Sequence, residues 1–99
     1  RYLDADLSFH VAIAEAAHNR ILSNALELLR NLTRRWIRAA LSLPSVPGEA
    51  LDQHKAIFLA IAKRRPDQAR AAMSAHLEAM GRRLMEARER GFVPPGEGL

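Results

Sequence analysis

The chain has 99 residues, of which 48% are hydrophobic and 5% aromatic, enough for one small domain with an aliphatic core. Its 15 basic residues exceed its 11 acidic ones and give a net charge of +4, but both signs mix along the chain, which indicates a solvated surface. Cysteine is absent, which excludes disulfides and thiolate metal ligands and fits a cytoplasmic protein. No apolar run of about 18 residues occurs, so we expect no membrane span.

The first half of the chain predicts two helices. The first is expected from about Leu3 to His18, and Asn19 has the character of a helix-ending or turn residue. The second is expected from about Arg20 to Leu41 as one continuous element. Its apolar residues recur at helical spacing and should face inward, among them Leu22, Leu29, Leu32 and Trp36.

The second half predicts a loop, two more helices and a tail. Two prolines and a glycine in residues 42–48 predict the loop, after which a helix is expected over about residues 49–63. Pro66 suits the first turn of a last helix, which should run to about Arg90. The residues expected to face inward are Leu51, His54, Ile57, Phe58 and Ile61, then Ala69, Met73, His76, Leu77, Met80 and Leu84.

These elements predict an all-α antiparallel bundle of about four helices, because nothing in the chain alternates like a strand and the connections are short. We expect one helical domain over residues 1–91. Gly91 should end the last helix, and residues 92–99, rich in proline and glycine, should form a flexible tail.

Three of the four histidines lie on helical apolar faces. Asp6 and His10 are one helical turn apart, while His54 and His76 lie on the last two predicted helices. An aspartate and three imidazoles that converge inside a bundle form a pattern typical of a divalent metal site. Histidines that are simply hydrogen-bonded in a core are the alternative interpretation. His18 is off this face, which predicts a surface or capping role.

The positions of His54 and His76 can be tested against hairpin geometry. The turn between the last two helices should centre near Arg65, and each histidine is then 11 residues away from it. Both therefore lie about 16 Å from the turn, so their side chains should meet. Whether Asp6 and His10 lie at the same height along the bundle as His54 stays open. The loop over residues 42–48 would have to span about 10–15 Å along the bundle axis to bring them level.

The order of these motifs resembles the C-terminal effector-binding domain, FCD, of FadR-type GntR transcription regulators. The matching pieces are Asp6-x-x-Phe9-His10, Asn19, His54 in the segment 52–61, and His76-Leu77 after an alanine-rich run. The resemblance covers about residues 2–84. It implies a helical bundle that binds a divalent metal through Asp6, His10, His54 and His76, with Zn²⁺ or Ni²⁺ before Mn²⁺ or Fe²⁺. It further implies a small organic acid effector at that metal.

The resemblance also implies partners for the whole protein. Regulators of this family commonly form homodimers and bind DNA through an N-terminal winged helix-turn-helix domain, which this chain lacks together with the family's first helices. We therefore expect no operator binding by this chain alone. Asn19 matches the family asparagine and is expected near the effector pocket or, equally, as a plain helix cap. Gln53 departs from the family pattern, which often has glutamate before this histidine.

Three other interpretations stay open. A metal with open positions could serve a hydrolase, although no general base stands beside the expected ligands, so we expect no enzyme. A helical dimerisation module without metal is the second. The third is a nucleic-acid-binding module, because Arg30, Arg34, Arg35 and Arg38 form a basic ridge and residues 63–65 a second basic patch.

Overall fold

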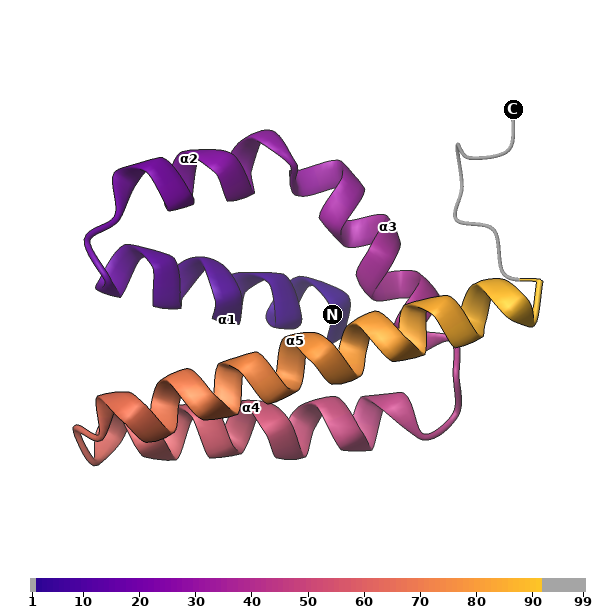
Figure 1. Ribbon diagram of the computed structural model, residues 1–99. Helices are drawn as coiled ribbons and strands as arrows, with labels where there is room; N and C mark the ends of the chain where they lie inside the picture. Colours follow the sequence, from indigo (N-terminus) through magenta and orange to yellow (C-terminus); the bar gives the residue numbers. More distant parts are fainter. Residues whose placement is uncertain (1, 92–99) are drawn as a thin grey trace. The chain divides into compact units, whose positions relative to one another are not determined.

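The computed structural model describes residues 2–91, which form five α-helices and no strand (Figure 1). The helices are α1 (Tyr2–Ala16), α2 (Arg20–Leu28), α3 (Arg30–Leu41), α4 (Val46–Ala62) and α5 (Pro66–Glu89). This confirms the predicted all-α class. Within this part of the chain, no helix combines the length and the apolar character that crossing a bilayer requires. The predicted tail over residues 92–99 lies outside the described residues.

The chain divides after Arg38 into two compact units, and each is described by itself. In the first unit, α1 and α2 lie side by side and run in opposite directions (Figure 1). The turn between them is tight because His18 adopts a left-handed conformation with φ of 55°. Asn19 then caps α2, since its side-chain oxygen accepts a hydrogen bond from the backbone N–H of Leu22 at 3.0 Å.

The helix predicted over residues 20–41 is interrupted at Leu29, so the single-helix prediction is wrong. Leu29 has φ of −94° and ψ of 13°, which lies outside the helical region, and α3 turns away from α2 at this residue (Figure 1). The hydrogen bonds continue on both sides, because Leu29 donates to the carbonyl of Ala25 and Thr33 donates to that of Leu29. Neither proline nor glycine stands at this bend, and we find no sequence signal for it.

In the second unit, the segment between α3 and α4 is shorter than the predicted loop over residues 42–48. Helix α4 already begins at Val46, because proline is tolerated in the first turn of a helix and Pro47 stands there. Leu43 and Val46 fold back into a small apolar cluster with Ala40 and Ala87. This cluster joins the end of α3 to the far end of α5.

Helices α4 and α5 form an antiparallel hairpin whose seam consists largely of small residues. The buried residues of α4 recur at intervals of about one or two turns, and those of α5 follow the same pattern. Alanine at most of these positions lets the two backbones approach closely. The buried residues are Val46, Ala50, Ile57 and Ala60 in α4 and His76, Ala79 and Ala87 in α5.

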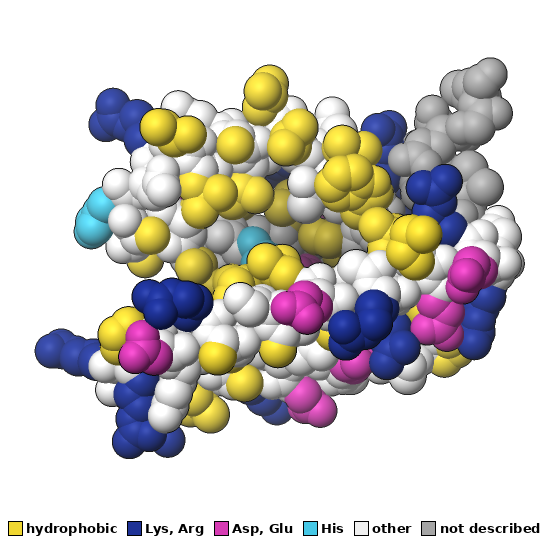
Figure 2. Space-filling view, viewed as in Figure 1, with side chains coloured by type: hydrophobic (Ala, Val, Ile, Leu, Met, Phe, Trp, Pro, Cys, Tyr) yellow, Lys and Arg dark blue, Asp and Glu magenta, His cyan; other side chains and the backbone are white. Residues whose placement is uncertain are grey.

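The predicted inward faces of α4 and α5 are correct at Ile57 and His76, which are buried in this seam, and wrong at several larger apolar residues. Phe58 is 59% exposed and Leu77 is 58% exposed, and Leu51 and Ile61 are also exposed. Periodicity favours the most apolar face of each helix, whereas the seam also uses alanines beside that face, such as Ala50, Ala60 and Ala79. In the first unit, Leu22, Leu29 and Trp36 are likewise exposed, and apolar side chains reach the surface along α2 and α3 (Figure 2).

The turn between α4 and α5 depends on a left-handed residue. Arg64 has φ of 56°, which glycine adopts readily but a side chain with a Cβ does not. The turn is closed by backbone hydrogen bonds from Arg64 to Ile61 and from Arg65 to Ala60. Pro66 then starts α5 as predicted.

We predict that Arg64→Gly raises the free energy of unfolding by about 0.5–1 kcal/mol, because relief of the left-handed strain exceeds the entropic cost of glycine. Chemical denaturation would measure this. Lys63→Gly is the matched control: Lys63 has an ordinary φ of −86°, so its replacement should cost about 0.4–1 kcal/mol. Equal decreases in the free energy of unfolding of both variants would contradict the claim that Arg64 is strained.

Candidate metal centre

The first pair of candidate ligands lies on α1. Asp6 Oδ1 and His10 Nε2 are 3.4 Å apart, as expected for residues at positions i and i+4 of one helix. Asp6 is buried and His10 is largely so, with 7% and 19% of their side chains exposed. The ring of Phe9 meets that of His10 edge to face, with centroids 5.6 Å apart. An aspartate and an imidazole thus stand together on one face of the helix.

The second pair joins α4 and α5 within the second unit. His54 Nε2 and His76 Nε2 are 3.2 Å apart, with ring centroids 4.7 Å apart and planes inclined by 76°. Equal distance of the two histidines from the turn predicts this contact. His76 is buried in the seam, with 2% exposed, while His54 is half-buried at its side. The two Nε2 atoms face each other.

This second pair fits a shared metal ion. Two nitrogens that bind one ion at about 2.0–2.1 Å lie about 2.9–3.4 Å apart, depending on the angle between the bonds. The Nε2 separation of 3.2 Å falls within this range. In the metal-free protein the same distance suits an N–H···N hydrogen bond. Imidazole suits Zn²⁺, Ni²⁺ and related ions, so the donor chemistry is compatible with the predicted metal.

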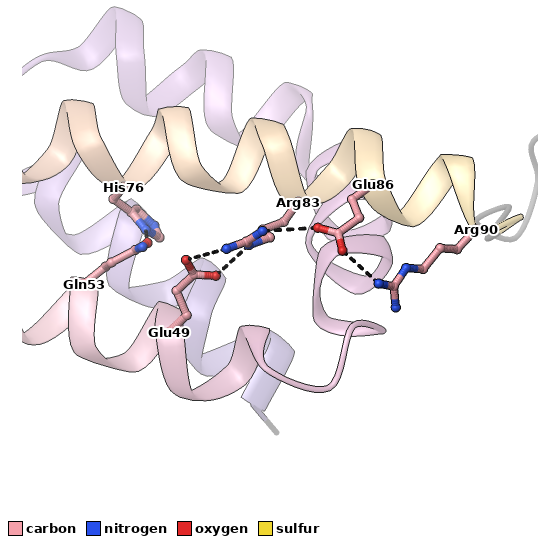
Figure 3. Close-up of polar contacts among 6 residues, drawn as sticks. All are labelled: Glu49, Gln53, His76, Arg83, Glu86 and Arg90. Atoms are coloured by element: carbon pink, nitrogen blue, oxygen red, sulfur yellow. Dashed lines mark hydrogen bonds and ion pairs between the residues drawn. The ribbon is translucent and has the colours of Figure 1, made fainter.

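Gln53 contacts His76 on the side away from His54. The side-chain oxygen of Gln53 is 2.6 Å from His76 Nδ1 (Figure 3). An amide oxygen only accepts hydrogen bonds, so Nδ1 of His76 is the donor here. In the sequence, Gln53 is notable only as a departure from the family pattern, and this contact is not predicted. Its spacing from the turn, close to that of His76, is the signal that could have found it.

A line of ion pairs continues the hairpin contact beyond His76. Arg83 on α5 donates two hydrogen bonds to the carboxylate of Glu49 on α4, at 2.9 and 3.2 Å, and a third to Glu86 at 3.1 Å (Figure 3). Glu86 is also paired with Arg90 at 3.0 Å. The hydrogen bond from Arg83 first, and its charge second, lower the pKa of Glu49 against the opposing effect of burial. Arg83 is therefore held between two carboxylates.

The remaining sequence-predicted residues have local roles. Asn19 is the N-cap of α2, which agrees with the capping alternative. His18 is exposed in the turn before it, as predicted. Two arginines of the basic ridge are paired with acids, since Arg34 lies 2.9 Å from Asp4 and Arg30 lies 3.7 Å from Glu27. Acidic and basic side chains also mix along α5 (Figure 2), which favours a solvated surface.

Comparison with known proteins adds to this geometry. The family description "FCD domain" matches residues 1–79. The chain belongs to the FCD domain family. The match includes all four candidate ligands. No solved structure matches the chain significantly.

Relatives of this FCD domain are transcription regulators by name. One, named for the L-lactate dehydrogenase operon of Escherichia coli K12, is 36% identical over 74% of this chain and 30% of its own length. The Uxu operon transcriptional regulator of the same organism is 37% identical over 82% of the chain and 34% of its own length. The HTH-type transcriptional regulator LutR of Bacillus subtilis 168 is 32% identical over 74% of the chain and 36% of its own length. The chain therefore spans about a third of the length of these relatives.

We predict that Glu49→Gln lowers stability in a pH-dependent way. A carboxylate whose pKa is lowered in the folded state stabilises it above the ordinary pKa of about 4.5, and this contribution is lost as the pH falls through the folded pKa. The difference in unfolding free energy between wild type and variant should thus be constant near pH 7 and shrink as the pH falls below 4.5 and through the folded pKa. Chemical denaturation across this range measures it. Glu78→Gln, which removes an exposed carboxylate of α5, is the matched control.

Proposed function

We propose that this FCD domain is the ligand-sensing part of a bacterial transcription regulator. In this proposal a divalent metal is held by Asp6, His10, His54 and His76, and a small organic acid binds at that metal. The observation that carries it is the pair of facing nitrogens on His54 and His76, 3.2 Å apart in a buried seam. Membership of the FCD family supports the sensing role.

In this proposal the ligands of the ion come in two pairs, one from α1 and one from the α4–α5 hairpin. Asp6 and His10 offer one oxygen and one nitrogen from a single face of α1, and the α4–α5 hairpin offers two nitrogens. We propose that the two pairs serve the same ion. A metal held by one carboxylate and neutral imidazoles keeps a net positive charge, so it would attract a carboxylate ligand.

The class of effector follows from this charge and from the relatives' names. A hydroxy acid can offer its carboxylate and hydroxyl oxygens together, and one relative is named for an L-lactate dehydrogenase operon. L-Lactate is therefore the first ligand to test, followed by dicarboxylates and sugar acids. In the whole protein, effector binding would favour one helix packing over another and so bias a DNA-binding dimer in the cytoplasm. We expect no enzymatic turnover.

We predict about one transition metal ion per chain in protein purified without chelator, measured by elemental mass spectrometry. Zn²⁺ or Ni²⁺ should predominate. The double variant His54→Ala/His76→Ala should lose the ion, because it removes both nitrogens of the hairpin pair. His18→Ala is the matched control: it removes an exposed imidazole outside the proposed site and should keep the metal. Metal content unchanged in the double variant, or absent in wild type after incubation with Zn²⁺ and Ni²⁺, would count against the proposal.

We predict that L-lactate or another small hydroxy acid stabilises the metal-loaded domain. At a concentration of 100 times Kd, binding to the folded state alone adds about 2.7 kcal/mol, which a thermal melt detects. 1,2-Propanediol, which lacks the carboxylate, should give no shift. The metal-free double variant should not respond either. Equal shifts in melting temperature with and without metal would show that the effector binds independently of the ion, and would refute this part of the proposal.

A further inference from the structure

The buried imidazole of His76 has polar contacts at both of its nitrogens. Nδ1 lies 2.6 Å from the side-chain oxygen of Gln53, and Nε2 lies 3.2 Å from Nε2 of His54. A neutral imidazole carries one proton, so one nitrogen donates and the other accepts. The contact with Gln53 therefore decides what the opposite nitrogen can do.

Gln53 has no charge to offer, but its carbonyl oxygen is fixed in place. Gln53 lies on α4 and reaches across the hairpin seam to His76 on α5, next to the ion pair of Glu49 and Arg83 (Figure 3). With the proton of His76 on Nδ1 and directed at this oxygen, the lone pair of Nε2 points towards His54. In the metal-free protein, His54 then supplies the proton between the two rings from its own Nε2.

We infer that Gln53 is a positioning residue that sets the tautomer and the ring orientation of His76, so that Nε2 is the metal-binding atom. This inference rests on the proposed metal site. The hydrogen-bond partner of a ligating histidine fixes its ring and tautomer, and loss of such a partner typically weakens metal binding 10–100-fold. Gln53 acts through a neutral carbonyl, so it orients the ring without adding a negative charge beside the ion.

The first test reads the tautomer in the metal-free chain, whose mass of 11.0 kDa suits NMR. Long-range ¹⁵N–¹H correlation of the imidazoles separates a protonated ring nitrogen from a bare one. We expect His76 to carry its proton on Nδ1 and His54 on Nε2. In Gln53→Leu the Nδ1–H preference of His76 should be lost, whereas Gln53→Glu should retain it because a carboxylate oxygen also accepts the bond.

The second test measures Zn²⁺ affinity by competition with a chelator of known affinity. Gln53→Leu should bind at least about 10-fold more weakly than wild type. Gln53→Glu should bind at least as tightly as wild type, which also covers the case in which the leucine variant fails to fold. Gln68→Leu is the matched control, because Gln68 is exposed in the first turn of α5 and should leave the affinity unchanged.

The outcomes separate this inference from the proposed function. A proton on Nε2 of His76 in the wild type, or wild-type Zn²⁺ affinity in a folded Gln53→Leu, would overturn the role of Gln53 while the metal site stands. Absence of Zn²⁺ binding by the wild type would overturn the proposed function and the metal-positioning role together. The inference is supported if Gln53→Leu loses both the Nδ1–H preference of His76 and Zn²⁺ affinity while Gln53→Glu and Gln68→Leu keep them.

Discussion

The antiparallel register of α4 and α5 is the constraint on which the candidate site depends. Because the two helices are joined by a tight turn, residues at similar distances from it lie opposite one another. This places His54 and Gln53 against His76, and Glu49 against Arg83. The seam is lined mostly by alanines, which let the two backbones approach closely while these polar side chains meet across it. Packing and polar contacts thus support the same register.

Much of the helical layout could be predicted from the sequence because its signals are local. Proline at the start of α5, asparagine before α2 and glycine after α5 each act on the backbone of their own turn. The bend at Leu29 has no such residue, so the sequence does not predict it. The sequence does not predict the early start of α4, because proline usually breaks a helix, although Pro47 occupies the one helical turn that tolerates it.

The candidate site was predictable to the extent that it follows from spacing. The separation of Asp6 and His10 and the equal distances of His54 and His76 from the turn both require only helix geometry. The sequence does not predict the contact of Gln53 with His76, because Gln53 stands beside the apolar face that periodicity predicts on α4 and not within it. Periodicity identifies faces, but which face meets a partner depends on volume and polar pairing across the whole contact. The joining of the two ligand pairs at one ion stays a prediction.

The turn at Arg64 shows that length, rather than composition, is what the α4–α5 segment must preserve. Three cationic residues in a row occupy this turn, one of them in a backbone conformation that glycine prefers, and the hairpin still closes. One residue inserted or deleted within either helix between Gln53 and His76 would instead rotate the contact residues on its two sides by about 100° relative to each other and shift them by about 1.5 Å. That change would disrupt the polar contacts between α4 and α5 that depend on this register. The α4–α5 segment should therefore vary in residue type more readily than in length.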